Sequence, residues 1–238
     1  MSSTIKPIQL YGDFLSPNPL KIRLILAVLE VPFENIEVAF NKIKEPEYLA
    51  INPNGRLPSI HDPNTGLTIW ESGAIIEYLI ERYDTQEPRK LSFTPRSAEA
   101  ELARSFLHLQ TSGQGPYYGQ AWWFKNYHAE KIPSAVERYI NEAKRVTGVL
   151  DGVLGKQKEV YSEDLGDGPW LVGNKMSYAD VAFIPWQQAI HVSFVEDGFN
   201  IDEFPNEKEW FERMNAVEKI KDVLDSAAEL RAKANFGK

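Results

Sequence analysis

Cysteine is absent from this chain of 238 residues. Its absence excludes disulfide bonds, a cysteine nucleophile, thiolate metal sites and a Cys-X-X-Cys redox pair within the chain. Histidine is scarce as well. The four histidines, at positions 61, 108, 128 and 191, show neither metal-ligand spacing nor a Ser-His-Asp arrangement. We therefore expect no metal site.

Long hydrophobic runs and an excess of positive charge are also missing. The longest helix-like apolar run covers residues 24–29, which is far too short to cross a bilayer. The first twelve residues lack the apolar core of a signal peptide. A formal net charge of -8 disfavours nucleic-acid backbones and anionic membranes. We expect a cytoplasmic protein with no nucleic-acid partner and no membrane partner.

The first third of the chain alternates strand-like and helix-like segments. Short runs rich in Ile, Val and aromatic residues predict strands, and apolar residues at helical spacing predict helices. The expected strands cover 7–12, 33–40, 57–62 and 67–70, with a Pro-Asn-Thr-Gly turn between the last two, and the expected helices cover 19–30, 45–53 and 71–83. This order predicts a small mixed sheet with helices packed on it.

A polar stretch with two prolines follows, and residues 87–96 within it are the predicted linker. Beyond it the strand signals disappear and helical periodicity dominates. We therefore predict an α/β domain over 1–86 and an all-helical domain over 97–238. In the helical part, Ser177 and Asp180 have the spacing of a capping box, which favours a structural role for Asp180 over that of a catalytic acid.

The first helix begins after a sharp chain reversal, "SPNP" at residues 16–19. The pattern predicts Asn18 as the N-cap and Pro19 as the first helical residue. Unpaired N–H groups and the macrodipole make such a helix start favourable for an anion. From the residues alone, capping is the simpler role for Asn18.

Three motifs in order resemble the cytosolic glutathione transferase superfamily: "NPNGRLPSI", "WESGAIIEYL" and "PWLVGNKMSYADVAFIPW". The segment 110–151 is similar to the group that contains the yeast nitrogen-regulator prion protein, its fungal enzyme relatives and the bacterial nu class. This resemblance implies a thioredoxin-like N-terminal domain that binds glutathione. It also implies a helical domain that forms the electrophile pocket and part of a homodimer interface.

The resemblance assigns the thiol contact to the start of the first helix. In this group a Pro-Asn pair, here at 17–18, replaces the Tyr, Ser or Cys of other classes. The Asn18 amide and the Ser16 hydroxyl are then expected to donate to the glutathione thiolate and to lower a thiol pKa that is ordinarily near 8.5. The chain departs from the usual pattern at Pro19, where glycine is common. Tyr11, in the first strand, is the competing thiol contact.

The resemblance also assigns the rest of the glutathione site. Leu57, before a cis Pro58, is expected to pair with the cysteinyl backbone, and Arg56 to reach a carboxylate. Glu71 and Ser72 are expected to bind the γ-glutamyl amine and carboxylate. The remaining expected contacts are the glycyl carboxylate with Lys44 or Lys42, and Arg138 reaching glutathione across the dimer, unless Arg138 forms only a salt bridge on an exposed helix.

The electrophile pocket is expected along "GPYYGQAWWF" in the helical domain, because aromatic faces suit flat or apolar substrates. Its expected wall comprises Pro116, Tyr117, Gln120, Ala121 and Phe124, although part of this set is equally compatible with core packing.

The predicted function is that of a glutathione transferase with glutathione as co-substrate. The second substrate is a small hydrophobic electrophile, a peroxide or a disulfide. Because the chain has no cysteine, disulfide chemistry has to proceed through glutathione itself. The alternative is a regulatory or carrier protein on the same fold that binds glutathione or another ligand without turnover.

Overall fold

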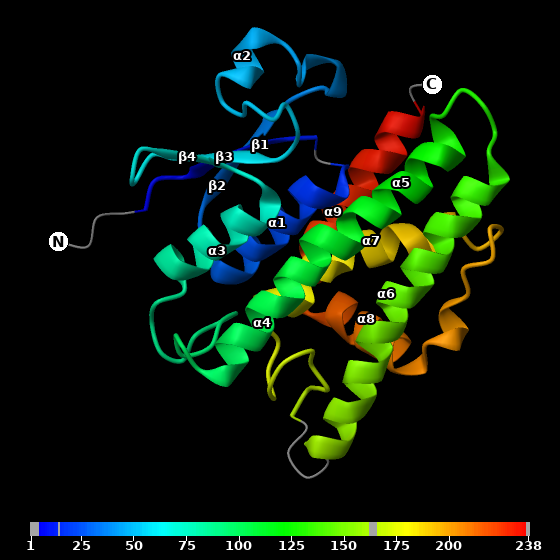
Figure 1. Ribbon diagram of the computed structural model, residues 1–238. Coiled ribbons are helices and arrows are strands. Elements are labelled where there is room, and N and C mark those ends of the chain that lie inside the picture. Colours follow the sequence, from blue (N-terminus) through cyan, green and yellow to red (C-terminus); the bar gives the residue numbers. More distant parts are fainter. Residues whose placement is uncertain (1–4, 14, 162–165, 237–238) are drawn as a thin grey trace. The chain divides into compact units, whose positions relative to one another are not determined.

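The computed structural model describes residues 5–13, 15–161 and 166–236 (Figure 1). The chain divides into two compact units: Met1–Leu91 together with Asn215–Lys238, here called the sheet unit, and Ser92–Met214, here called the helical unit. The break after residue 91 falls inside the predicted linker. The last helix is grouped with the sheet unit, although the predicted domain limits place it in the helical domain. Among the described residues, no helix is long and apolar enough to span a membrane.

Four strands form one mixed sheet in the order β2-β1-β3-β4. They are β1 (Ile8–Gly12), β2 (Phe33–Glu37), β3 (Ser59–Asp62) and β4 (Leu67–Trp70). Strand β1 runs parallel to β2 and antiparallel to β3, and β4 is antiparallel to β3. The predicted second strand was too long, because the chain leaves the sheet after Glu37 and enters the 3-10 helix η1 (Phe40–Lys42).

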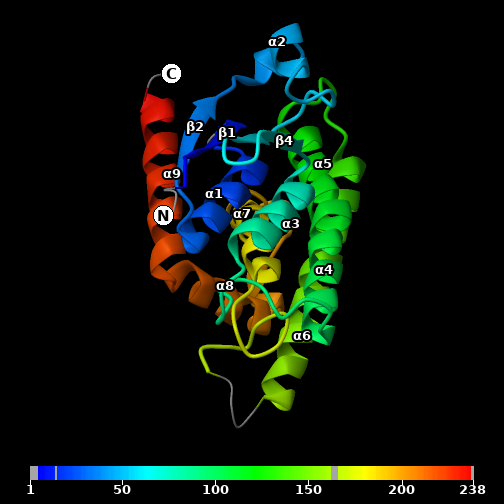
Figure 2. The same ribbon diagram turned by 90° about the vertical axis from the view of Figure 1, so that its left-hand side faces the viewer.

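Helices α1 (Pro17–Leu29) and α3 (Ser72–Tyr83) lie on one side of the sheet, and the short α2 (Pro46–Leu49) lies on the other (Figures 1 and 2). The last helix, α9 (Glu218–Phe236), packs beside α1. Because α1 has neighbours on several sides, its residues from 19 to 26 are all buried.

The far end of the β3–β4 hairpin is fixed by Asp62, which is fully buried. The Tyr78 hydroxyl donates to its carboxylate at 2.6 Å, and the Tyr83 hydroxyl donates to the same oxygen. Burial alone favours a high pKa for Asp62, but these bonds and two from Asn64 bring the pKa below its usual value. Tyr83, the last residue of α3, is only partly buried, and its hydroxyl reaches this carboxylate.

The described residues of the helical unit form helices and no strand. Its elements are α4 (Ala98–Leu109), the π-helical turn η2 (Gln110–Gln114), α5 (Gly115–Asn126), α6 (Pro133–Val160), α7 (Tyr178–Ser193), η3 (Ile201–Glu203) and α8 (Pro205–Ala216). Thus a small mixed sheet with helices is followed by a helical domain, which confirms the predicted fold class.

Asp180 has the structural role that its spacing predicts. It completes the capping box with Ser177 at the start of α7. Its Oδ1 also accepts hydrogen bonds from the Leu171 amide at 2.9 Å and from the Trp210 indole at 3.0 Å. The carboxylate is fully buried and joins three separate segments of the helical unit. It is therefore part of the core and not a catalytic acid.

Candidate functional site

The sheet brings three chain segments to one of its ends. In the strand register Tyr11 lies opposite Ser59, and Ser59 lies opposite Trp70. The end of β1, the start of β3 and the end of β4 are therefore neighbours. The reversal that leads into α1 follows β1, the residue pair 57–58 precedes β3, and the pair 71–72 follows β4. Segments predicted to share one site thus lie together in the sheet unit.

The start of α1 differs from the predicted cap. The helix begins at Pro17, and Ser16 is the N-cap residue with extended backbone, so the prediction of Asn18 as N-cap is wrong. Proline at the first helical position needs no N–H partner and already has a helical φ, which moves the start two residues earlier. Asn18 consequently lies within the first turn, where its amide is not the cap.

Gly12 makes room for the unusual Pro19. A Cβ atom on Gly12 would lie 2.8 Å from the Pro19 Cβ, closer than real side chains approach. A glycine at the end of β1 therefore lets the proline ring pack directly against the strand. This close packing accounts for how the chain accepts proline where the group usually has glycine.

The reversal before α1 is supported by a residue from the other end of the chain. The Leu15 amide donates to Asp13 Oδ1 at 2.8 Å, and the Leu15 carbonyl accepts from Arg231 Nη2 of α9 at 2.9 Å. Burial lowers the pKa of Arg231, and the Asp13 carboxylate opposes that shift. The sequence offered no local signal for Arg231, because the two partners are 216 positions apart.

The loop before β3 exposes a stretch of backbone. The Leu57–Pro58 peptide bond is cis, as expected. The Arg56 carbonyl accepts from the Tyr48 hydroxyl at 2.8 Å and from the Asn52 side-chain amide at 2.7 Å. Burial raises the pKa of Tyr48, so its hydroxyl remains a neutral donor. Leu57 lies just outside β3, and its N–H and carbonyl make no hydrogen bond to the described residues.

Glu71 and Ser72 form the start of α3. Glu71 is the N-cap residue and has φ of 69°, a left-handed conformation that costs a non-glycine residue about 1–3 kcal/mol. The Asn54 side-chain amide donates to Glu71 Oε1 at 2.9 Å. The Glu71 side chain is exposed, whereas Ser72 is buried at the first helical position. A carboxylate and a helix start are thus presented side by side.

Lys44 belongs to the same group of residues. Its ammonium donates to the Asn54 carbonyl at 3.0 Å. Gly55 has φ of +57°, and a Cβ there would lie 2.8 Å from the Ile43 carbonyl oxygen, so glycine is required at this turn. Lys42, the alternative cation, is exposed in η1. Sequence reasoning missed Asn54, although its place in "NPNG" beside a glycine was an available signal.

A buried lysine of α1 lies near Glu71. Lys21, in the second turn of α1, is only 1% exposed. Burial lowers its pKa to about 7, and the nearby Glu71 carboxylate partly offsets the shift. Two charged residues, Lys21 and Arg23, among apolar neighbours in "PLKIRLIL" were the available sequence signal, but the motif analysis did not use it.

Tyr11, the competing thiol contact, lies in β1. Its hydroxyl donates to Gln9 Oε1 at 3.1 Å, on the same face of the strand. The hydroxyl is therefore engaged within the sheet, and Tyr11 stays the weaker candidate.

The predicted electrophile wall lies on α5 in the helical unit. Phe124 stacks on Tyr139 with centroids 5.7 Å apart and on His128 at 5.0 Å, and Tyr117 lies 6.3 Å from Tyr139. Pro116 and Gln120 are exposed, whereas Ala121 is fully buried. Tyr139 and His128 were missed because they belong to other segments. A role of this aromatic group in substrate binding stays a prediction.

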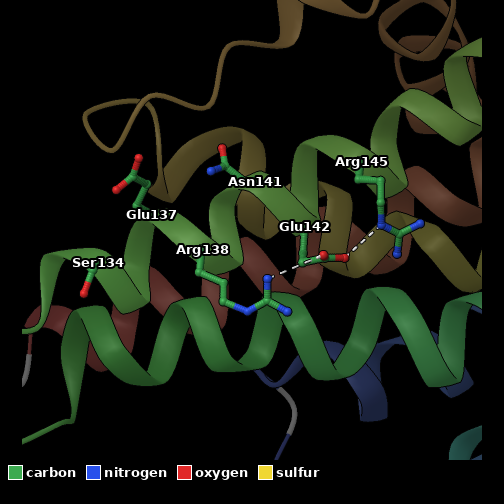
Figure 3. A pocket seen from close by; sticks show the side chains of 6 residues that line it. All are labelled: Ser134, Glu137, Arg138, Asn141, Glu142 and Arg145. Carbon is green, nitrogen blue, oxygen red and sulfur yellow. Dashed lines mark hydrogen bonds and ion pairs between the residues drawn. The ribbon is translucent and has the colours of Figure 1, made fainter.

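Arg138 lines a groove on α6 with a volume of about 350 Å³ (Figure 3). Its side chain is 64% exposed, and its Nη1 lies 4.0 Å from Glu142 Oε1. Arg145 binds the same carboxylate more closely, at 2.8 Å. The remaining lining residues are Ser134, Glu137 and Asn141. The weak ion pair leaves most of the Arg138 guanidinium exposed to solvent, and a glutathione contact across a dimer stays a prediction.

No group of three or more His, Asp or Glu side chains among the described residues has the arrangement of a metal site.

Comparisons with known proteins show the family of this chain. Residues 6–81 match the family model "Glutathione S-transferase, N-terminal domain", and residues 128–218 match "Glutathione S-transferase, C-terminal domain". The chain is 52% identical over 225 residues to the glutathione S-transferase-like protein gedE of Aspergillus terreus, covering 94% of this chain and 97% of gedE. It is 35% identical to the protein URE2 of Meyerozyma guilliermondii, over 86% of this chain and 75% of that protein.

Among solved structures, the chain resembles the glutathione transferase URE2P6 of Phanerochaete chrysosporium in complex with oxidized glutathione. The TM-score is 0.85 with 40% identity, covering 96% of this chain and 99% of that one. Both halves of the family pattern are therefore present, and the relatives align over most of the chain. The chain belongs to the glutathione S-transferase family, and its relatives include both fungal transferase-like proteins and URE2 proteins.

Proposed function

We propose that this protein binds glutathione at the end of its sheet and lowers the pKa of the glutathione thiol at the start of α1. The activated thiol then reduces small disulfides or peroxides, or is conjugated to small apolar electrophiles. The observation that carries the proposal is the pair Glu71 and Ser72 beside the open Leu57 backbone.

The pair suits the zwitterionic γ-glutamyl head group. The exposed Glu71 carboxylate, held by Asn54, is a partner for the γ-glutamyl ammonium. The start of α3, with the Ser72 hydroxyl and N–H, is a partner for the neighbouring carboxylate. One acidic and one anion-binding group side by side match an amino acid better than they match a simple anion or cation.

The Leu57 backbone extends the same match along the peptide. Its N–H and carbonyl have no partner among the described residues, so the cysteinyl backbone of glutathione can pair with them as a short strand would. The peptide then runs from α3 towards the start of α1. Lys44, between η1 and α2, and Arg56, in the loop before β3, are both exposed and are the proposed cations for the glycyl carboxylate.

Thiol activation is assigned to the first turn of α1. Helix N–H groups and the macrodipole favour the thiolate over the thiol. The Ser16 hydroxyl and the Asn18 amide are the proposed side-chain donors. Because Asn18 is not the N-cap residue, capping does not account for its presence there.

In disulfide reduction, the bound thiolate attacks one sulfur of the substrate disulfide and forms a new S–S bond. The other sulfur leaves as a thiolate and takes a proton from solvent. A second glutathione thiolate then attacks the mixed disulfide, which yields oxidised glutathione and the reduced substrate thiol. The complexes of the Phanerochaete chrysosporium proteins URE2P6 and URE2P8 with oxidized glutathione support this reaction, and those of Ure2p with S-hexylglutathione and S-p-nitrobenzylglutathione support conjugation equally.

The testing experiment is a pH titration of the ultraviolet thiolate absorbance of bound glutathione. We expect a midpoint well below 8.5 in the wild type and an upward shift of about one unit in Asn18→Ala. Tyr11→Phe is the matched control, and its midpoint should equal that of the wild type. A shift in Tyr11→Phe but not in Asn18→Ala would reassign the thiol contact. Binding with an ordinary midpoint would instead support the non-catalytic alternative.

A further inference from the structure

Lys21 is a charged residue in the buried part of α1. It is 1% exposed, and its neighbours in the sequence, Leu20 and Ile22, are fully buried apolar residues. Lysine is almost never fully buried unless its charge is compensated. An apolar side chain of similar volume fills such a site without the cost of removing an ammonium from water. A lysine kept at this position therefore needs interactions that compensate its charge, and the Glu71 carboxylate supplies one of them.

The position of Lys21 connects it with both helix starts of the proposed site. Side chains on an α-helix lean towards its N-terminus, so the lysine stem extends back towards the first turn. Asn18 lies three positions earlier, on the same face of α1. The Glu71 carboxylate at the start of α3 acts electrostatically on Lys21. The amine thus lies within electrostatic reach of the proposed γ-glutamyl site, on the face of α1 that carries the proposed thiol contact.

Arg23, the other charged residue of α1, is also buried, and burial lowers its pKa. Two ionisable groups near the start of α1 have partners of their own. Arg231 of α9 donates to the Leu15 carbonyl, and Tyr11 of β1 donates to Gln9. Glu71 is the charged group whose field acts on Lys21. Burial lowers the Lys21 pKa to about 7, so charged and neutral forms coexist near neutral pH. A new anion nearby will favour the charged form.

We propose that Lys21 is a positioning residue of the glutathione site, whose buried ammonium is the counter-charge of the bound thiolate and which gains a proton when that thiolate forms. This inference rests on the proposed function. In the balanced step, the S–H bond of glutathione breaks and its proton passes to solvent, while the neutral Lys21 amine takes one proton from solvent and forms an N–H bond. Thiolate formation at neutral pH then releases less than one net proton.

Comparing glutathione with S-hexylglutathione separates the effect of the thiolate on Lys21 from the effect of the rest of the ligand. S-hexylglutathione carries the same γ-glutamyl and glycyl groups, but its alkylated sulfur has no proton to lose. Any effect of the γ-glutamyl ammonium on Glu71, and through Glu71 on Lys21, is therefore shared by both ligands. Only glutathione can place a thiolate at the start of α1.

The first test follows the Lys21 side chain in the wild-type protein labelled with 13C-lysine. Its NMR signal is assigned as the one missing in Lys21→Arg. We expect Lys21 to titrate near pH 7 in the free protein and at least one unit higher with glutathione than with S-hexylglutathione. Equal titration with the two ligands would overturn the proposal.

The second test measures the thiolate midpoint of bound glutathione in two variants. We expect Lys21→Met to raise it by about one unit and Lys21→Arg, which keeps a permanent charge, to leave it at or below the wild-type value. S-hexylglutathione affinity should stay within about twofold in both variants. Its loss in Lys21→Met would assign a merely structural role and overturn the proposal.

Ligand binding by the wild-type protein distinguishes a failure of the proposed function from a failure of the proposed role of Lys21. If wild-type protein binds neither glutathione nor S-hexylglutathione, the proposed function is wrong, and the role of Lys21 is wrong with it. If glutathione binds with a lowered thiol pKa but neither Lys21 test responds, only the role of Lys21 is overturned.

Discussion

Replacing Lys21 by methionine should make the protein more stable, by an amount that depends on pH. Methionine fills a similar volume without charge, so packing is largely kept. What changes is the cost of holding an ammonium in the core of the sheet unit. The folded protein bears this cost whenever lysine in the unfolded chain is protonated.

The magnitude follows from the pKa of Lys21, which falls from the ordinary 10.5 to about 7 in the folded protein. Each unit of pKa difference corresponds to about 1.4 kcal/mol, so the folded state loses about 5 kcal/mol at and below pH 7. Between pH 7 and 10.5 the unfolded chain binds a proton that the folded protein lacks. Wild-type stability therefore gains up to about 1.4 kcal/mol per pH unit in this window, and Lys21→Met lacks this gain.

The assay is urea unfolding of both proteins at one protein concentration, followed by tryptophan fluorescence at pH 7, 8, 9 and 10. The advantage of Lys21→Met should be largest at pH 7 and nearly gone at pH 10. A contact that lysine makes and methionine cannot make adds the same amount to the difference in unfolding free energy at every pH. The change of that difference with pH is therefore the informative quantity. A difference in unfolding free energy that stays constant from pH 7 to 10 would refute the reasoning.

Three further predictions concern the fold that carries the site. Gly12→Ala should cost about 1–3 kcal/mol because its Cβ meets Pro19 at 2.8 Å, and adding Pro19→Gly should restore most of the loss in urea unfolding; an unchanged midpoint would contradict the close packing. Asp62→Asn should lower the free energy of unfolding by about 2 kcal/mol at pH 7. The pKa of Asp62 is lowered in the folded protein, so its carboxylate stabilises the fold at pH values above the ordinary pKa of aspartate, and this stabilisation is lost as pH falls through the folded pKa. The melting temperature of Asp62→Asn should therefore fall less steeply with acid than that of the wild type, and an equally steep fall in both proteins would argue against this reasoning. Asp180→Ala should cost at least about 3 kcal/mol in chemical unfolding, because a cap and two further buried bonds are lost, and a loss under 1 kcal/mol would contradict its structural role.

Elements with strong local signals were predictable from the sequence. The hairpin turn at 63–66, the start of α3 and the capping box of α7 each depend on residues within a few positions of one another. The motifs around Leu57 and Glu71 were found for the same reason. Local backbone preferences are carried by neighbouring residues, so the sequence displays them directly.

The rest of the site depends on contacts between distant segments. The cap of α1 was predicted two residues late, because both Pro17 and Pro19 suit a first helical position and packing of Pro19 on Gly12 decides between them. Arg231 reaches Leu15 from the last helix, and no nearby residue announces that contact. The burial of Lys21 depends on the packing of α3 and α9 beside α1, which the sequence around it does not display.

The assignment of α9 to the sheet unit has a consequence for how the chain is made. Residues 1–91 are synthesised before residues 92–214, and the helix that packs beside α1 is synthesised after both. During synthesis α1 must therefore wait for this neighbour until residues 218–236 have been made, while all of residues 92–214 are already available to fold. A fragment ending after residue 91 should be aggregation-prone, whereas one that fuses 215–238 to it through a short linker should be soluble.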